Sequence, residues 1–311
     1  MKDKIVCRVL TGPTASGKTA LSLTLAERNG WEILCMDSMQ IYRRMDIGTA
    51  KPSAEERRRV PHHMIDILEP ADSFSAAEYK ERAETLVREK REKEGKDVLF
   101  VGGTGLYLWA MTHSASMGAV PADEGLRAEL KAAAEEPGGK KRLHDMLERI
   151  DPETAARLPE NDVRRVIRAL EVTRLTGVPF SRQPRAEEES PFVWRIAALT
   201  LPRDILYARI NRRVDEMIRL GLREEVRALL AEGVPPDAQS MQGLGYKEMI
   251  PHLRGERTLE KAVEEIQKGS RHYAKRQETF LRRDPAPARV DALAPDAAEQ
   301  LERIFSTDGQ G

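Results

Sequence analysis

The sequence predicts an α/β fold, in which a parallel β-sheet is flanked by helices and interrupted by a helical insertion. Two observations lead to this prediction. Short apolar segments alternate with helical segments near the N-terminus, and strands separated by helices form right-handed βαβ units. Helical segments then follow one another until a strand pattern returns at residue 193. We therefore assign residues 1–115 and 196–311 to the α/β core and residues 116–195 to the insertion.

Each core element has its own signal in the sequence. The expected strands are short apolar segments at residues 4–10, 31–37, 97–103 and 193–202. Helices are expected at residues 18–30 and 78–96, where Gly30 and Gly95 serve as stop signals, and then at 203–221, 222–233 and 258–283. The tail after Asp284 is Ala/Pro-rich and gives no information on secondary structure.

Composition excludes several classes of protein. The chain has 311 residues, of which 40% are hydrophobic, so it can bury a core and is not disordered. Lys and Arg balance Asp and Glu at 51 each, so the net charge does not indicate a polyanionic partner. No apolar run is long enough to span a bilayer. The only two cysteines, Cys7 and Cys35, lie in apolar strand-like segments and are expected to be buried and reduced. We expect a monomeric, cytoplasmic protein without a membrane partner.

The strongest motif is GPTASGKT, residues 12–19, which has the P-loop spacing Gly12-x-x-x-x-Gly17-Lys18-Thr19. It lies between a predicted strand and a predicted helix, as phosphate binding requires. Its glycines let backbone amides surround phosphate oxygens, Lys18 supplies a charge, and Thr19 supplies a hydroxyl for Mg²⁺. The motif predicts a P-loop NTPase-like core that binds a nucleotide, for which ATP is the usual ligand.

Asp37 ends the second predicted strand, so it should lie beside the P-loop at the carboxyl edge of the sheet. It could accept a substrate proton, help to hold Mg²⁺, or cap the following helix. The third strand ends in Gly102, Gly103, Thr104 and Gly105, where many P-loop enzymes place an acidic residue for the metal. This segment therefore lacks one part of the usual ATPase apparatus, and its glycines are expected to leave room for a bulky group near the site.

Basic residues gather in three places, and each group suits either an anionic ligand or a solvated surface. Arg164, Arg165 and Arg168 lie in the insertion, and Arg209, Arg212 and Arg213 lie in a core helix. The third group is interleaved with His272, Tyr273 and Phe280, a pattern that suits phosphate contacts and base stacking on RNA. It comprises Lys268, Arg271, Lys275, Arg276, Arg282 and Arg283.

These motifs together resemble one family. The segments GPTASGKT, DSMQIYRRMDIGTAKP, VPHHMIDI, VGGTGLY, NDVRRVIRALEV, RRVDEMIRLGLREEV, QGLGYKE and YAKRQETF follow one another in this order. They closely resemble the tRNA dimethylallyltransferases, also called tRNA isopentenyltransferases, from residue 5 to about residue 283. Phe280 stands where many relatives have Trp, and no C2H2 zinc finger is appended, which implies the compact bacterial form.

The resemblance implies a reaction. The family transfers a dimethylallyl group from dimethylallyl diphosphate to the N6 amine of the adenosine 3′-adjacent to the anticodon of tRNA, with Mg²⁺ as cofactor. It implies that Asp37 is the general base and that Thr19 binds the metal. It also implies that the diphosphate is held by Arg213 and by the P-loop residues Gly12, Pro13, Thr14, Ala15, Ser16, Gly17, Lys18 and Thr19. It also implies tRNA contacts from Asp37, Ser38, Met39, Gln40, Thr104, Arg127, Asn161, Asp162, Val163, Arg164, Arg165, Tyr273, Lys275, Arg276 and Gln277.

Three other functions compete with this one. The first is prenylation of a free adenine nucleotide, against which the insertion and the basic C-terminal helix indicate a macromolecular substrate. The second is a small-molecule kinase that uses ATP at the same loop. The third is a non-catalytic RNA-binding module, which leaves Lys18 and Asp37 unexplained.

Overall fold

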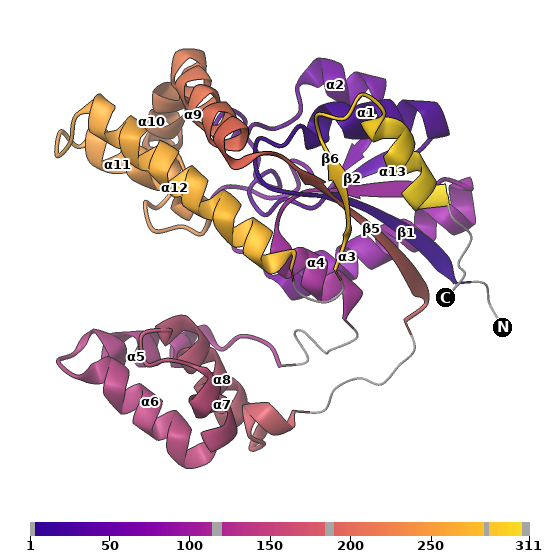
Figure 1. Cartoon of the computed structure of the whole chain (residues 1–311). Coiled ribbons are helices and arrows are strands. Elements are labelled where there is room, and N and C mark those ends of the chain that lie inside the picture. The colour runs from indigo at the N-terminus through magenta and orange to yellow at the C-terminus, as the bar shows by residue number, and fades with distance from the viewer. Residues whose placement is uncertain (1–3, 114–119, 184–189, 283–285, 307–311) are drawn as a thin grey trace. The chain divides into compact units, whose positions relative to one another are not determined.

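The computed structural model describes residues 4–113, 120–183, 190–282 and 286–306 (Figure 1). The chain forms two compact units, one of Met1–His113 with Ser190–Gly311 and the other of Ser114–Glu189. Residues 192–195, which the sequence placed in the insertion, belong to a core strand instead.

The core unit is built on a six-stranded sheet in which every pair of neighbours is parallel. The strand order is β3-β2-β4-β1-β5-β6. Their bounds are β1 Ile5–Thr11, β2 Glu32–Cys35, β3 His62–His63, β4 Val98–Val101, β5 Phe192–Thr200 and β6 Ala288–Asp291. Because β2, β4 and β1 are neighbours, the segments that leave their carboxyl ends meet at one edge of the sheet. The predicted α/β class and parallel sheet are confirmed.

Helices cover both faces of the sheet. One face carries α1 (Lys18–Asn29) and α13 (Ala297–Ser306), whose Leu23, Leu25, Leu301 and Phe305 share a buried core with Leu10 of β1 and its neighbours. The other face carries α3 (Ala76–Glu89), which continues as the π-helix η1 (Lys90–Glu94), and α4 (Gly105–Thr112). Figure 1 shows these two helix layers on either side of the strands. The short helix α2 (Ala54–Arg59) precedes β3.

The C-terminal helices form a group of their own at one end of the sheet (Figure 1). They are α9 Arg203–Leu220, α10 Leu222–Ala231, the 3₁₀ turn η3 Ser240–Gln242, α11 Tyr246–Leu253 and α12 Leu259–Phe280. Leu206 and Ile210 of α9 and Ala274 of α12 share a small core, against which Ala15 of the P-loop packs. This contact fixes the group beside the P-loop.

The described part of the C-terminal tail, residues 286–306, contains regular structure, about which the sequence was uninformative. It supplies the edge strand β6 and the helix α13, and Phe305 packs edge-to-face on Trp31 with ring centroids 6.1 Å apart. Few apolar residues make this contact, among them Val290, Leu301 and Phe305. They are separated by Ala, Pro and charged residues, so the sequence of the tail shows neither a strand period nor a helix period. Contacts with the sheet determine its structure.

The second unit is all-helical, with α5 Glu124–Glu135, α6 Gly139–Ile150, α7 Pro152–Arg157, α8 Val163–Thr176 and the 3₁₀ turn η2 Phe180–Arg182. Leu130, Leu143, Leu147, Val166 and Leu170 are among the residues of its own buried core.

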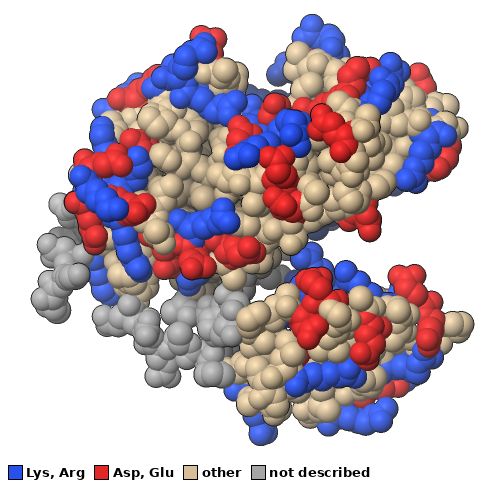
Figure 2. Space-filling view, turned by 180° about the vertical axis from the view of Figure 1, so that it is seen from behind, with Lys and Arg blue, Asp and Glu red and all other residues tan. Residues whose placement is uncertain are grey.

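Charged side chains of both signs are interspersed over the face of the molecule seen in Figure 2, as the balanced composition requires. Within the described ranges, no helix is both long and apolar enough to cross a membrane.

Candidate active site

The P-loop connects β1 to α1, and its shape depends on two glycines. Gly12 has a φ of +137°, and a Cβ there would lie 2.9 Å from the backbone oxygen of Leu199. Gly17 has a φ of +97° at the N-cap of α1. Both angles lie in the left-handed region, which side chains disfavour. The loop therefore curls back and presents backbone amides at the positive end of the helix dipole.

Two hydroxyl groups of the loop are available to a ligand. The Ser16 side chain is buried, yet its Oγ has no hydrogen-bond partner among the described residues. A buried polar atom without a partner is costly, and a bound phosphate oxygen would satisfy it. Thr19 lies exposed in the first turn of α1. The loop is thus built for an anion.

Lys18 crosses the loop and is held by its backbone. Its Nζ donates to the backbone oxygens of Gly12 at 2.9 Å and Pro13 at 2.8 Å. Burial and the positive charge of Arg213 lower the pKa of Lys18 to about 7, while Asp37 acts in the opposite direction. A neutral amine still has two N–H groups for the two carbonyls. Lys18 is therefore poised to gain a proton when an anion arrives.

Asp37 follows β2 and organises the turn after it. Its Oδ1 accepts hydrogen bonds from the backbone amides of Met39, at 2.8 Å, and Gln40, at 3.4 Å. Its Oδ2 makes no hydrogen bond within the part of the chain that the structure describes. The residue therefore caps a turn with one oxygen, where one of the sequence-based alternatives expected the cap of a helix, and keeps the other oxygen available for a substrate proton.

Arg213 lies on α9 and completes the charged site. It makes no hydrogen bond or ion pair with the residues that the structure describes. Burial lowers its pKa, and the charge of Asp37 partly offsets this effect. Lys18, Asp37 and Arg213 each act electrostatically on one another, so the structure brings these three predicted residues together. Lys18 and Arg213 form no ion pair with a carboxylate in the described part of the chain, and two such basic groups beside the P-loop suit a diphosphate.

Gln277 lies inside the site rather than on its surface. Its Oε1 accepts from the Thr14 amide at 2.8 Å, and its Nε2 donates to the Gly103 oxygen at 2.8 Å. It is buried and clamps α12 to the P-loop and to the end of β4, while the tRNA contact predicted at Gln277 stays a prediction. Tyr273 lies one turn earlier on α12, and burial, together with the charge of Asp37, raises the pKa of its hydroxyl.

The glycine-rich segment after β4 does not leave the room that its sequence suggested. A Cβ on Gly102 would lie 2.0 Å from the Met36 oxygen, and one on Gly103 would lie 2.2 Å from Gln277 Nε2. A Cβ on Gly105 would lie 2.7 Å from the Phe280 ring. The expectation of space for a bulky group is therefore wrong at these positions, because the chain's own backbone and α12 fill it.

The predicted substrate-lining residues after Asp37 have different surroundings. The Ser38 amide donates to Thr104 Oγ1 at 3.0 Å, so these two residues are neighbours as expected. Met39 packs against Gly243, where a Cβ would lie 2.4 Å from the Met39 methyl carbon. The Gln40 side chain is used internally, since it donates to the Thr49 and Ala50 oxygens at 3.1 and 3.3 Å. Gln40 shapes the loop instead of presenting its amide to a ligand.

The exposed face of α12 carries the predicted basic residues. Lys275 and Arg276 are exposed, and the Arg276 guanidinium lies 5.7 Å from the centroid of the Tyr273 ring. Lys268 and Arg282 are exposed as well, whereas Arg271 donates to Asn211 on α9 at 2.6 Å. Arg283 lies outside the described residues.

The predicted residues of the helical unit split into two groups. Asn161, Arg164 and Arg165 are exposed around the start of α8, where Asp162 pairs with Arg165 at 3.3 Å and Val163 packs on the unit's core. Arg127 is different, because it binds the buried carboxylate of Glu171, which also pairs with Arg168. Arg127 and Arg168 therefore stabilise the unit internally.

Sequence reasoning missed two positions that the structure ties to the site. The Glu225 carboxylate binds the loop after Asp37, and the Tyr246 hydroxyl donates to Glu225 at 2.6 Å. Tyr246 and Glu225 lay within two segments that carried the resemblance, QGLGYKE and RRVDEMIRLGLREEV, but nothing in either segment singled out these two side chains.

Comparison with known proteins identifies the family. A family model described as IPP transferase matches residues 40–284. The tRNA dimethylallyltransferase of Halalkalibacterium halodurans is 48% identical to the chain, over 98% of this chain and 96% of the relative. The chain belongs to the IPP transferase family. It is a prenyltransferase, as the sequence predicted.

Solved structures of the IPP transferase family agree with this assignment. The full-length tRNA isopentenylpyrophosphate transferase of Bacillus halodurans is 44% identical, covers 98% of this chain and 95% of that one, and has a TM-score of 0.70. A eukaryotic dimethylallyltransferase acting on tRNA is 25% identical, covers 96% of this chain and 78% of that one, and has a TM-score of 0.78. The predicted family and P-loop-like fold are confirmed.

Proposed function

We propose that this chain transfers a dimethylallyl group from dimethylallyl diphosphate to N6 of the adenosine 3′-adjacent to the anticodon of tRNA, giving N6-isopentenyladenosine. The observation that carries the proposal is the meeting of Lys18, Arg213 and the P-loop with the open Oδ2 of Asp37. Such a site binds a diphosphate and accepts a proton beside it. A tRNA substrate also implies that the protein works in the cytoplasm.

The chain's own residues account for the charges that develop in this reaction. The allylic C–O bond breaks, the C–N bond to N6 forms, and the electron pair of the broken bond leaves with the diphosphate. Lys18, Arg213 and the loop amides stabilise that leaving group. Asp37 Oδ2 takes the proton that N6 loses, so the product amine is neutral. The target base must leave the stack of the anticodon loop before it can reach this site.

The residues present fit a bound Mg²⁺ ion. Mg²⁺ usually takes one or two protein oxygens and completes its shell with substrate phosphates and water. Thr19 would hold it, because its hydroxyl is exposed beside the diphosphate cradle. Among the residues that the structure describes, no group of three or more His, Cys, Asp or Glu forms a separate metal site. The ion would supply positive charge to the departing diphosphate.

Contacts with tRNA are proposed for the exposed basic residues of α12 and for the start of α8. Lys275 and Arg276 belong to the helix whose buried Gln277 clamps the P-loop, so phosphate contacts there lie on the element that shapes the donor site. Asn161, Arg164 and Arg165 supply the contacts from the helical unit. A macromolecular substrate explains these surfaces better than a free nucleotide does.

Incubation with Mg²⁺ and labelled dimethylallyl diphosphate tests the proposal. We expect label in unmodified tRNA, at the adenosine after the anticodon, and little in AMP. Label in AMP but not in tRNA would identify a nucleotide prenyltransferase. ATP turnover without any label transfer would identify a kinase.

Replacing both Lys275 and Arg276 with Ala is expected to weaken tRNA binding and to lower the slope of log Kd against log salt by about 2, since each phosphate contact contributes about 1. Filter binding across a salt series measures the slope. Arg91→Ala with Lys93→Ala is the matched control, because it also removes two charges but lies in η1, before β4 and at the opposite edge of the sheet. An equal change in both variants would argue against a contact surface on α12.

Binding of a diphosphate at pH 8 is expected to take up a proton. The pKa of Lys18 is about 7 in the free protein, so most of its amine is neutral at pH 8, and a bound anion raises that pKa. Uptake is expected to vanish below about pH 6, where Lys18 is already protonated. Calorimetry in buffers of different ionisation enthalpy measures it, with Lys18→Met as the control. Equal uptake in that variant would assign the proton to another group.

A further inference from the structure

The loop between β2 and α2 is held in a conformation that its sequence does not favour. Arg44 and Ala50 have positive φ angles of 61° and 46°, and Met64 and Asp66 of the adjoining segment have φ angles of 60° and 53°. Non-glycine residues enter this region at a cost, which persists only where surrounding contacts impose it. The contacts that hold this loop therefore determine its shape.

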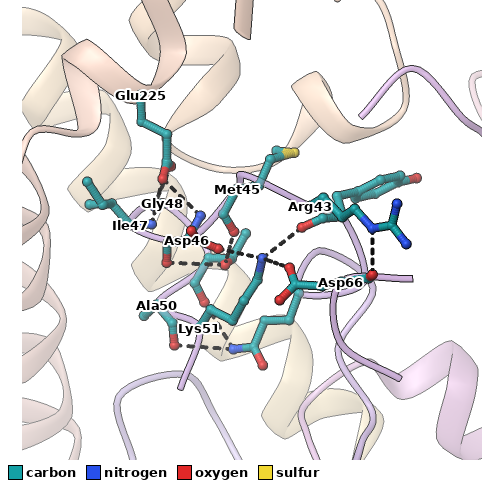
Figure 3. A network of polar contacts seen from close by, with 12 residues as sticks. Arg43, Met45, Asp46, Ile47, Gly48, Ala50, Lys51, Asp66 and Glu225 are labelled. Carbon is teal, nitrogen blue, oxygen red and sulfur yellow. Dashed lines mark hydrogen bonds and ion pairs between the residues drawn. The ribbon is translucent and has the colours of Figure 1, made fainter. Parts of the chain in front are cut away.

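The first of these contacts is Glu225 on α10. Its Oε2 accepts from the backbone amides of Asp46 and Ile47, both at 2.8 Å, and its Oε1 accepts from Gly48 at 3.1 Å. Figure 3 shows the carboxylate pointing at these three successive amides. Consecutive amides that converge on one anion form a strong, oriented site, and charge-assisted bonds of this kind are about twice as strong as neutral ones.

Tyr246 completes the surroundings of this carboxylate. Its hydroxyl donates to Glu225 at 2.6 Å, and its ring lies where a side chain on Gly48 would be, 2.5 Å from a Cβ at that position. Glu225 thus has four donors, one hydroxyl and three amides, which matches the capacity of a carboxylate.

The second contact is Lys51, whose side chain is 1% exposed. Its ammonium donates to the Tyr42 oxygen at 2.7 Å and to the carboxylates of Asp46 and Asp66, both at 2.6 Å (Figure 3). Asp46 therefore takes part in both contacts. Its carboxylate accepts from Lys51, and its backbone amide donates to Glu225.

Hydrogen bonds connect this anchored segment to Asp37. The side-chain Nε2 of Gln40 donates to the backbone oxygens of Thr49 and Ala50, which directly follow the residues bound by Glu225. The backbone amide of Gln40 in turn donates to Asp37 Oδ1. Hydrogen bonds thus connect Glu225 to Asp37 through two segments of one loop, residues 46–50 and residues 37–40.

We propose that Glu225 is a positioning residue, which fixes the Asp37 turn relative to the diphosphate site; the inference rests on the proposed function. α10 follows α9 directly after Gly221, and α9 carries Arg213. Glu225 therefore ties the loop that bears the proton acceptor to the helix pair that bears the leaving-group arginine. Displacing a catalytic group by about 1 Å can cost 10²-fold in rate, while affinity for substrates is retained.

The test compares Glu225→Gln with Glu224→Gln. Both remove one negative charge from the same turn of α10. The Glu224 side chain, however, is 55% exposed, and among the described residues its ion pairs are with Arg223 and Arg227. In Glu225→Gln, one acceptor oxygen is replaced by an NH₂ group that faces amide donors. We expect kcat for tRNA prenylation to fall about 30-fold, with the KM values for both substrates within about 3-fold of the wild type. Glu224→Gln is expected to match the wild type.

Hydrogen exchange of the loop gives a readout independent of activity. The amides of Asp46, Ile47 and Gly48 are expected to exchange at least about tenfold faster in Glu225→Gln, with the central strands unchanged. If that variant does not fold, Glu225→Asp, shorter by one methylene, is expected to show the same pattern with a smaller effect.

The outcomes separate this inference from the proposed function. An active wild-type protein with an equally active Glu225→Gln variant overturns the inference alone, as does a loss that Glu224→Gln shares or that appears only in KM. A wild-type protein that transfers no label to tRNA overturns the proposed function, and the inference with it.

Discussion

Asp37→Asn is expected to lower the rate of prenyl transfer by about 10²–10⁴-fold, the range typical of a general base, while tRNA affinity changes by less than about 3-fold. Asparagine keeps an Oδ1 that accepts from the Met39 amide, so the turn retains its cap. It has no carboxylate oxygen for the substrate proton. Single-turnover transfer of labelled donor and a tRNA binding isotherm measure the two quantities.

Asp37→Ala separates the two roles of this residue. Alanine removes the cap as well as the base, so this variant should also lose stability, by about 1 kcal/mol. A similar rate in Asp37→Asn and in the wild type would show that Asp37 shapes the turn and is not the base. The thermal unfolding midpoints of both variants provide the comparison.

Arg213→Ala is expected to lower transfer by about 10²–10³-fold, because it removes a partly buried positive charge that would stabilise the charge building on the diphosphate. Arg213 has no carboxylate partner among the described residues, so the substitution leaves no unpaired acidic group behind. The protein should therefore stay folded. We expect the loss to appear in kcat and in kcat/KM together, as for a contact that strengthens in the transition state.

Arg212→Ala is the control for this prediction. Arg212 precedes Arg213 on α9 and carries the same charge, but its side chain is exposed. Steady-state kinetics with tRNA and dimethylallyl diphosphate should leave this variant near the wild type. Equal losses in both variants would mean that the charge of α9, and not a specific contact, drives the reaction.

Local features of the sequence determined the fold class and the centre of the site. The P-loop is a continuous segment whose conformation follows from Gly12 and Gly17, so its spacing alone predicts a phosphate cradle. Gly30 ends α1 in the left-handed conformation, as its position predicted. Asp37 was found because an acidic residue after an apolar strand must lie at the carboxyl edge of a parallel sheet. These inferences needed only neighbouring residues.

The roles of several side chains were decided by contacts between distant parts of the chain. Gln277 lies in a basic segment, where it resembled a surface residue, but packing of α12 on α9 turns it towards Thr14 and Gly103. The glycines after β4 predicted room for a bulky group near the site. In the fold, Met36, Gln277 and Phe280 occupy that room. The tail became strand and helix only because the sheet edge and Trp31 gave it partners.

The sequence by itself thus determined the α/β core, the P-loop, the place of Asp37 beside it and the family to which the chain belongs. Only the tertiary structure showed that Glu225 binds the loop after Asp37 and that Gln277 binds the P-loop. The physical reason is that a glutamate or glutamine in an amphipathic helix is expected to be solvated. Only helix packing shows that it lies against backbone amides that need an acceptor. Hydrogen bonds that join residues 46–48 to Glu225, and Thr14 to Gln277, leave no periodic signal in the sequence.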